Sequence, residues 1–235
     1  EEHRRQAEVL LPETAEAYFL RAMTAITVKE QLASLDRALQ LDPSHYESRR
    51  LRAFTYYASR KYDRLRDDAL AMTILRPRDP LGYSLHAVAW RESGRYPEAI
   101  VDYEIAMAFT PRDKPEYIDL SMQRCEVFLR MGEYERVIAE AIEHLSDKYG
   151  LSAAERQQLL PSGKQSVIRN RVGWARTYMK QAGLIEYVRR GCFRISEKGK
   201  KVLSEKPNRI DVHYLERFPE FITFRERRNK ETGEA

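Results

Sequence analysis

The sequence has few of the residues that build metal sites and disulfide scaffolds. Its 235 residues include only two cysteines, Cys125 and Cys192, and five histidines. Their spacing matches no C-x-x-C or H-E-x-x-H pattern, so we expect neither a structural zinc ion nor a disulfide framework, which suits a reducing cytoplasm. No apolar run approaches the roughly 20 residues that a membrane-spanning helix needs. We therefore expect a cytoplasmic protein that needs no membrane, metal or cofactor.

The net charge of +5 is divided unevenly along the chain. Residues 1–145 hold 21 Lys and Arg against 25 Asp and Glu, a net charge of −4, whereas residues 146–235 hold 20 against 11, a net charge of +9. Two parts of opposite sign indicate two domains with different partners. The basic part is the candidate for binding a polyanion, and a solvated basic surface is the alternative.

The first part contains a repeat of 34 residues. Pro43, Pro77 and Pro111 are spaced 34 residues apart, and each follows an apolar helical stretch. A period of this length is typical of stacked helical hairpins. The pattern resembles the tetratricopeptide repeat, on the residues Ala87, Trp90, Gly94, Tyr96, Ala99, Tyr103, Ala106 and Pro111. The preceding unit departs from it, with Arg60 at the position of the hairpin glycine.

About 3.5 repeats are expected over residues 12–145, as an α-α superhelix. The first helices of such an array line its concave side, which is the usual binding surface. A protein or peptide partner with acidic and apolar side chains fits the predicted groove, and a spacer without a ligand is the alternative. The predicted groove residues are Glu47, Arg50, Phe54, Tyr57, Leu81, Ser84, Val88 and Arg91.

The second part has the element order of a winged helix-turn-helix. Ser152 and Glu155 form a capping box for a short helix, and residues 166–182 carry an apolar stripe of Ile168, Val172, Ala175, Met179 and Ala182. The segments LIEYV and CFRIS then form a β-hairpin wing, followed by a last helix capped by Ser196. In this layout a helix enters the major groove of DNA and the wing lies near the flanking backbone.

The helix expected over residues 166–182 has a second, cationic stripe. Its residues are Arg169, Arg176 and Lys180, with Gly173 between the arginines, so that a phosphate strand can approach closely. The neighbouring Asn170 and Thr177 can read base edges. Trp174 and Tyr178 are expected to pack. The predicted DNA-binding residues are Lys164, Arg169, Asn170, Arg176, Thr177, Lys180, Arg189, Arg190, Arg194 and Lys198.

Four segments follow one another in the second part of the chain: LLPSGKQ, NRVGWARTYMKQAGLIE, RRGCFRISEKGKKVL and IDVHYLERFPEF. On these segments, residues 146–224 resemble the N-terminal winged-helix domain of Mrr-type restriction proteins. The resemblance implies a DNA-binding module, which in the family precedes a nuclease that cuts modified DNA. No paired acid with a Glu-x-Lys or Gln-x-Lys cluster follows here, so we expect no catalytic activity from this chain.

The domain boundary has two interpretations. Residues 118–145 fit a fourth repeat and also the first two helices of the winged domain, so we place the boundary between residues 115 and 147. We expect residues 1–145 to form the repeats, 146–224 the winged helix and 225–235 a charged flexible tail.

The leading hypothesis is a non-catalytic adaptor that binds duplex DNA, including modified DNA, through its winged helix and a protein through its repeats. Two alternatives stay open. One is a protein-interaction scaffold whose winged domain does not bind DNA, and the other is a fragment of a larger restriction endonuclease or signalling enzyme. No heptad pattern specifies an oligomer.

Overall fold

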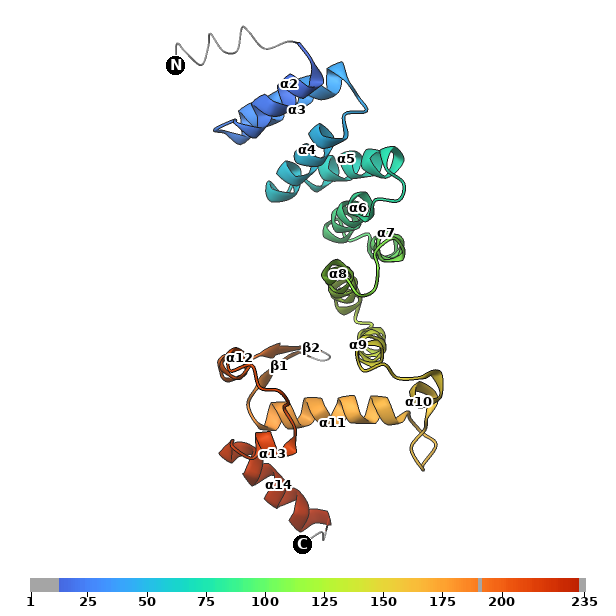
Figure 1. Cartoon of the computed structure of the whole chain (residues 1–235), viewed down its shortest axis with the longest axis vertical. Coiled ribbons are helices and arrows are strands. Elements are labelled where there is room, and N and C mark those ends of the chain that lie inside the picture. The colour runs from blue at the N-terminus through green and yellow to red at the C-terminus, as the bar shows by residue number, and fades with distance from the viewer. Residues whose placement is uncertain (1–12, 190–191, 233–235) are drawn as a thin grey trace. The chain divides into compact units, whose positions relative to one another are not determined.

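The computed structural model of the chain describes residues 13–189 and 192–232 (Figure 1). It is mainly helical with one two-stranded sheet, which confirms the predicted fold class. The chain divides into two compact units, residues 1–127 and 128–235, and each is described by itself.

The first unit is a series of helical hairpins, as the repeat predicted. Within each pair the helices pack against one another, and the second and third pairs are also joined by the packing of α5 on α6. The helices are α2 (Ala15–Met23), α3 (Val28–Leu41), α4 (Tyr46–Ala58), α5 (Tyr62–Leu75), α6 (Pro80–Glu92) and α7 (Tyr96–Ala108), followed by α8 (Pro115–Met131), which continues into the second unit. The resemblance to the tetratricopeptide repeat is thereby confirmed.

The chain reverses within the hairpins at residues with left-handed backbone. Gly94 has φ +76° between α6 and α7, and Arg60 takes φ +56° at the equivalent place between α4 and α5. A glycine adopts this conformation without steric cost, whereas a residue with a Cβ does not. The 34-residue period is therefore maintained at the backbone even where the repeat glycine is missing.

The core of the first unit combines small apolar residues with a buried ion cluster. Ala38, Ala53, Ala87 and Ala99 are fully buried, which lets neighbouring helices approach closely. Asp68 on α5 is 2% exposed and accepts hydrogen bonds from Arg49 and, at two nitrogens, from Arg52 of α4. Burial alone would lower the pKa of the Arg52 guanidinium, but its hydrogen bonds to Asp68 and the charge of that carboxylate raise it.

Trp90, near the end of α6, lies close to two cations of this unit. The guanidinium carbons of Arg66 and Arg95 are 5.1 Å and 5.2 Å from its ring centroid. The His86 ring packs edge-on against it at 5.3 Å, and His86 Nδ1 lies 2.8 Å from the Asp102 carboxylate. His86 therefore links Trp90 to the Asp102 carboxylate of α7.

The second unit follows the predicted order of helix, linker, helix, hairpin and helix. Side-chain caps begin four of its helices, from Ser152, Ser166, Ser196 and Asp211. β1 and β2 pair antiparallel, with Tyr187 opposite Phe193. The elements are α9 (Tyr134–Lys148), α10 (Ala153–Gln157), α11 (Val167–Gln181), β1 (Ile185–Arg189), β2 (Cys192–Ile195), α12 (Glu197–Ser204), α13 (Val212–Leu215) and α14 (Pro219–Thr232).

The core of the second unit is small and gathers at the end of α11. It consists of Ala182, Leu184, Val202, Leu215 and Phe221. Gly199 of α12 is required there, because a Cβ at this position would lie 2.1 Å from the Leu184 carbonyl oxygen. α12 can therefore lie directly on the backbone that leads into β1.

Two expectations about this unit are wrong. Ala175 was expected in the buried stripe of α11 but is exposed, because the core lies only at the C-terminal end of the helix. The expected flexible tail is helical as far as Thr232, since α14 packs Phe221 and Phe224 on the core and Arg225 pairs with Glu216. No helix in the described ranges is long and apolar enough to cross a membrane.

Candidate nucleic-acid interface

The ends of α11 are fixed by local contacts. At its start the Ser166 hydroxyl accepts a hydrogen bond from the Arg169 backbone N–H, and at its end Gly183 turns the chain with φ +72°. Tyr178 and Met179 pack against the core of the second unit. The helix is thus held at its C-terminal end, and none of its residues from Val167 to Gln181 is fully buried.

A cavity of about 620 Å³ lies beside the exposed part of α11. Four of the predicted DNA-binding residues line it, namely Arg169, Asn170, Arg176 and Thr177. Gly173 lies in the same lining, and a Cβ built there would meet no atom within 4 Å. The structure therefore brings these polar groups together around an open position on the helix. The Thr177 hydroxyl already donates to the Gly173 carbonyl oxygen at 3.0 Å.

The other side of this cavity is formed by α9, which the sequence did not place there. Ile138 and Ala141 of α9 line it, and the Glu135 carboxylate is paired with the Arg169 guanidinium. The sequence analysis described the cationic stripe as open to a phosphate strand. In the structure one of these cations, Arg169, is already paired with a carboxylate of α9.

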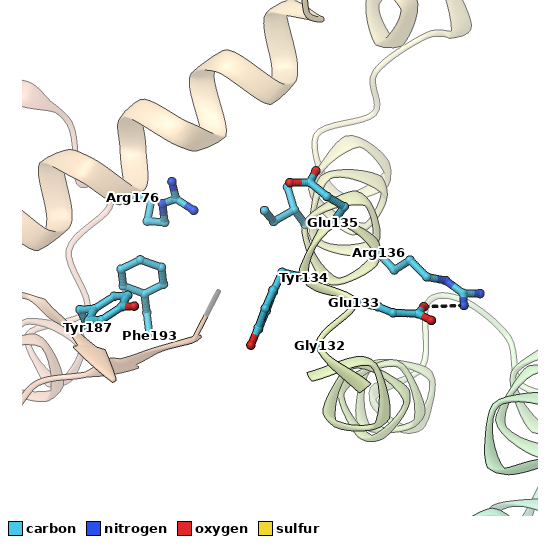
Figure 2. Close-up of a pocket in the computed structure, with 9 residues that line it drawn as sticks. Gly132, Glu133, Tyr134, Glu135, Arg136, Arg176, Tyr187 and Phe193 are labelled. Carbon is cyan, nitrogen blue, oxygen red and sulfur yellow. Dashed lines mark hydrogen bonds and ion pairs between the residues drawn. The ribbon is translucent and has the colours of Figure 1, made fainter. Parts of the chain in front are cut away.

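A second cavity, of about 730 Å³, opens between the start of α9 and the β-hairpin (Figure 2). The Phe193 ring lies 5.7 Å from the Tyr187 ring and 5.1 Å from the Arg176 guanidinium carbon, measured to ring centroids. Lys180 Nζ lies 5.9 Å from the Tyr187 ring. Tyr134 faces these rings from the α9 side (Figure 2). Two adjacent aromatic rings on this face thus each have a cation nearby.

The remaining predicted DNA-binding residues are more dispersed. Arg194 pairs with Glu186 across the hairpin, on the opposite face from Tyr187 and Phe193. The Lys198 ammonium lies 2.9 Å from Glu220 of α14, and Lys164 is exposed in the segment before α11. Arg190 falls outside the described residues, and of Arg189 only the backbone is described.

One cation near α11 was not predicted. Arg228 of α14 donates to the Tyr178 hydroxyl at 2.9 Å, and its guanidinium carbon lies 4.3 Å from the centroid of the Trp174 ring. Trp174 is 38% exposed and also packs against Tyr178, so the expectation that both rings pack holds best for Tyr178. The charged residues after Phe224 could have indicated a cation near α11, but the sequence analysis interpreted them as a flexible tail.

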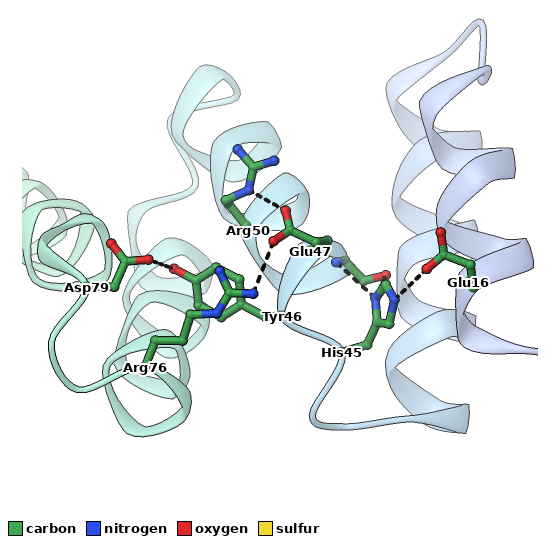
Figure 3. Close-up of polar contacts among 8 residues, drawn as sticks. Glu16, His45, Tyr46, Glu47, Arg50, Arg76 and Asp79 are labelled. Atoms are coloured by element: carbon green, nitrogen blue, oxygen red, sulfur yellow. Dashed lines mark hydrogen bonds and ion pairs between the residues drawn. The ribbon is translucent and has the colours of Figure 1, made fainter.

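The predicted groove of the repeats begins with a charged network (Figure 3). The Glu47 carboxylate accepts from Arg50 at 2.7 Å and from Arg76 at 3.4 Å. Arg76 lies over the Tyr46 ring, whose hydroxyl donates to Asp79 at 2.7 Å. Burial and the Asp79 carboxylate raise the pKa of Tyr46. Glu47 and Arg50 therefore compensate each other's charge.

The structure separates the other groove residues into accessible and inaccessible ones. Phe54 and Tyr57 on α4 are 38% and 45% exposed, and Leu81 and Ser84 are half-buried. Val88, expected to point into the groove, is buried, because α6 packs against both α5 and α7 and Leu85 to Ala89 are covered. Arg91 is mostly buried, pairing with Glu92 and donating to the Tyr103 hydroxyl.

Comparison with known proteins gives a separate result for each part. Residues 127–205, about a third of the chain, match the Mrr N-terminal domain family. No curated protein sequence matches the chain as a relative.

Solved structures of MamA share the helical-repeat fold. A crystal structure of MamA is 17% identical with a TM-score of 0.56, covering 86% of this chain and 100% of that one. MamA from residue 41 onward of Desulfovibrio magneticus RS-1 is 13% identical with a TM-score of 0.51, covering 59% and 78%. The chain thus joins a helical-repeat array of the tetratricopeptide type to a segment that matches the Mrr N-terminal domain.

Proposed function

We propose that the chain is a non-catalytic adaptor that binds duplex DNA through a winged-helix domain and a protein through its repeats. In this proposal α11 is the helix that enters the major groove and the β1–β2 hairpin is the wing. Residues 118–145 serve both as the last repeat and as the first helices of the winged domain. A DNA partner also fits the cytoplasmic location predicted from the sequence.

The main support for the DNA-binding proposal is that several polar side chains lie together along one side of α11. Arg169 and Arg176 flank the open position at Gly173, where a sugar-phosphate strand can approach the helix. Asn170 lines the same cavity, and an asparagine amide can form two hydrogen bonds with an adenine edge. The net charge of +9 over residues 146–235 adds long-range attraction for a polyanion.

The test is binding of the full chain to a labelled duplex over a series of salt concentrations. Affinity should fall steeply with salt, because each neutralised phosphate contributes about −0.9 to the slope of log K against log salt. Comparing unmodified with methylated duplex of the same sequence tests for a preference for modified DNA. Affinity that does not change with salt would contradict a DNA-binding role.

A second candidate is the protein-interaction scaffold without DNA binding. The ion pair between Glu135 and Arg169 favours it, since this contact engages the proposed DNA-binding face within the chain itself. The scaffold function predicts weak duplex affinity with little salt dependence, so the same titration distinguishes the two.

For the repeats, the proposed ligand is a peptide with apolar side chains that pack on Phe54 and Tyr57. Replacing both rings with alanine should abolish binding of such a partner while the duplex affinity stays unchanged. A variant with Leu70→Ala and Ile74→Ala removes comparably exposed apolar groups from α5 and serves as the control.

A further inference from the structure

The aromatic residues of the hairpin face the cavity in Figure 2 rather than the core. Tyr187 is 55% exposed, and neither it nor Phe193 belongs to the core cluster of the second unit or to the side chains packed on it. As a cross-strand pair they stand on the same face of the two strands. The two rings meet edge to face, at an interplanar angle of 73°, so it is the exposed face of Tyr187 that is available for a ligand.

Cations flank these rings on both sides. Arg176 lies over Phe193, and Lys180 lies near Tyr187, so the ring surface is bordered by the positive charge that a nucleic-acid backbone requires. Proteins that bind unpaired nucleotides combine such a basic track with aromatic rings on which bases stack. Purely electrostatic contact with duplex phosphates would use the cations but not the rings.

The opposite wall of the cavity adds a third ring and a hydrogen-bond acceptor. Tyr134 lies across the cavity from Tyr187 and Phe193 (Figure 2), and the Glu135 carboxylate is also in the lining. A carboxylate accepts hydrogen bonds from exocyclic amino groups, and the Arg176 guanidinium donates to ring nitrogens and carbonyl oxygens. A volume of about 730 Å³ is within the range of small-molecule sites.

We propose that this cavity receives one unpaired nucleobase of DNA bound along α11, stacked on Tyr187 beside Phe193, faced by Tyr134 and contacted at its edge by Arg176. The inference rests on the proposed DNA-binding function and specifies its substrate as DNA with an unpaired or extruded base. Bases in an intact duplex are stacked inside the helix and present no face to these rings.

The experiment compares two labelled DNAs of equal length at one salt concentration, a fully paired duplex and the same duplex with a single unpaired adenine. The full chain should bind the second DNA more tightly by about 5-fold or more, and Tyr187→Ala should remove that preference, because stacking on one aromatic ring contributes about 5- to 150-fold to affinity. Tyr187→Trp should keep it. Val188→Ala is the matched control, as Val188 is similarly exposed at 51% and is the next residue of the same strand.

Placing 2-aminopurine at the unpaired position gives a second readout, because its fluorescence reports stacking directly. Its emission should differ between the complexes of the wild type and of Tyr187→Ala. Equal wild-type affinity for the two DNAs, or a preference that survives in Tyr187→Ala, would overturn this inference and leave the proposed duplex binding intact. Binding of neither DNA would refute the proposed function and this inference together.

Discussion

The two units of the chain differ in what their arginines contact. In the first unit, Arg49 and Arg52 are mostly buried and form ion pairs with Asp68. Arg91 is also mostly buried and pairs with Glu92. In the second unit, Arg169 and Arg176 are exposed and line open cavities, and Arg169 meets only a solvent-exposed carboxylate. The same residue type therefore contributes to stability in one unit and is available for a ligand in the other.

The apolar side chains show the same contrast. Alanines, Leu35, Leu65, Met72 and Tyr103 are fully covered in the repeats, whereas the core of the second unit is a short cluster at one end of α11. A helix that is held at one end and only partly covered along the rest leaves side chains accessible to a ligand. The repeats are expected to determine the stability of the chain, and the second unit its affinity for DNA.

The largest expected effect comes from Asp68→Asn in the first unit. The substitution leaves Arg49 and Arg52 without their buried counter-charge, which should lower the free energy of unfolding by about 3 kcal/mol. Urea denaturation followed by circular dichroism measures the change. Asp63→Asn, which breaks an exposed pair with Arg66, should change it by less than about 0.5 kcal/mol. Equal effects of the two variants would show that the Asp68 cluster is not a buried contributor to stability.

The next effect is on DNA affinity, in the double variant Arg169→Ala with Arg176→Ala. Losing two contacts should weaken duplex binding about 10- to 100-fold and reduce the salt slope by about 2, with the unfolding free energy nearly unchanged. Fluorescence anisotropy over a salt series measures both quantities. The control is Arg78→Ala with Arg209→Ala, which removes the same charge from exposed positions that line neither cavity. A comparable loss of duplex affinity in the control would mean that Arg169 and Arg176 contribute only their charge and not specific contacts.

A smaller effect of opposite sign is expected from Glu135→Gln. Removing the carboxylate that pairs with Arg169 should tighten duplex binding about 2- to 5-fold, because an exposed ion pair contributes up to about 1 kcal/mol. The gain should shrink at high salt. Glu140→Gln makes the same charge change on α9 outside both cavity linings and should have less effect. Unchanged affinity in Glu135→Gln would mean that DNA does not compete for Arg169.

The smallest effect tests the repeat backbone. Arg60→Gly relieves a left-handed residue that has a Cβ and should raise the free energy of unfolding by about 0.5 to 1 kcal/mol. Gly94→Ala, at the equivalent position, should lower it by a similar amount. If the denaturation midpoints of both variants moved in the same direction, Arg60 and Gly94 would not be equivalent turn positions of the repeat.

The features that the sequence predicted correctly depend on local rules. The serine caps and the apolar spacing act within one or two turns of helix, and the 34-residue period spans one hairpin, so the hairpins and α11 could be located from the sequence. Asn170 and Arg176 were placed correctly on one side of α11 for the same reason.

The features that the sequence missed depend on contacts between distant residues. Glu135 and Arg169 are 34 residues apart, and their pairing is set by the path of the chain through α10 and the segment before α11. The burial of Val88 follows from α6 packing on two neighbours, which a pattern for one helix does not contain. Arg228 reaches Trp174 only because α14 folds back along α11.

The placement of the two tryptophans gives each unit its own optical signal. Trp90 lies among the arginines of the repeats and Trp174 lies on α11 beside the proposed DNA-binding residues, and the sequence contains no other tryptophan. With Trp90→Phe, emission excited at the indole band arises from α11 alone, so a single spectrum follows arrival of DNA at that helix. With Trp174→Phe, the same measurement follows unfolding of the repeats, and the two units can be observed separately in one intact chain.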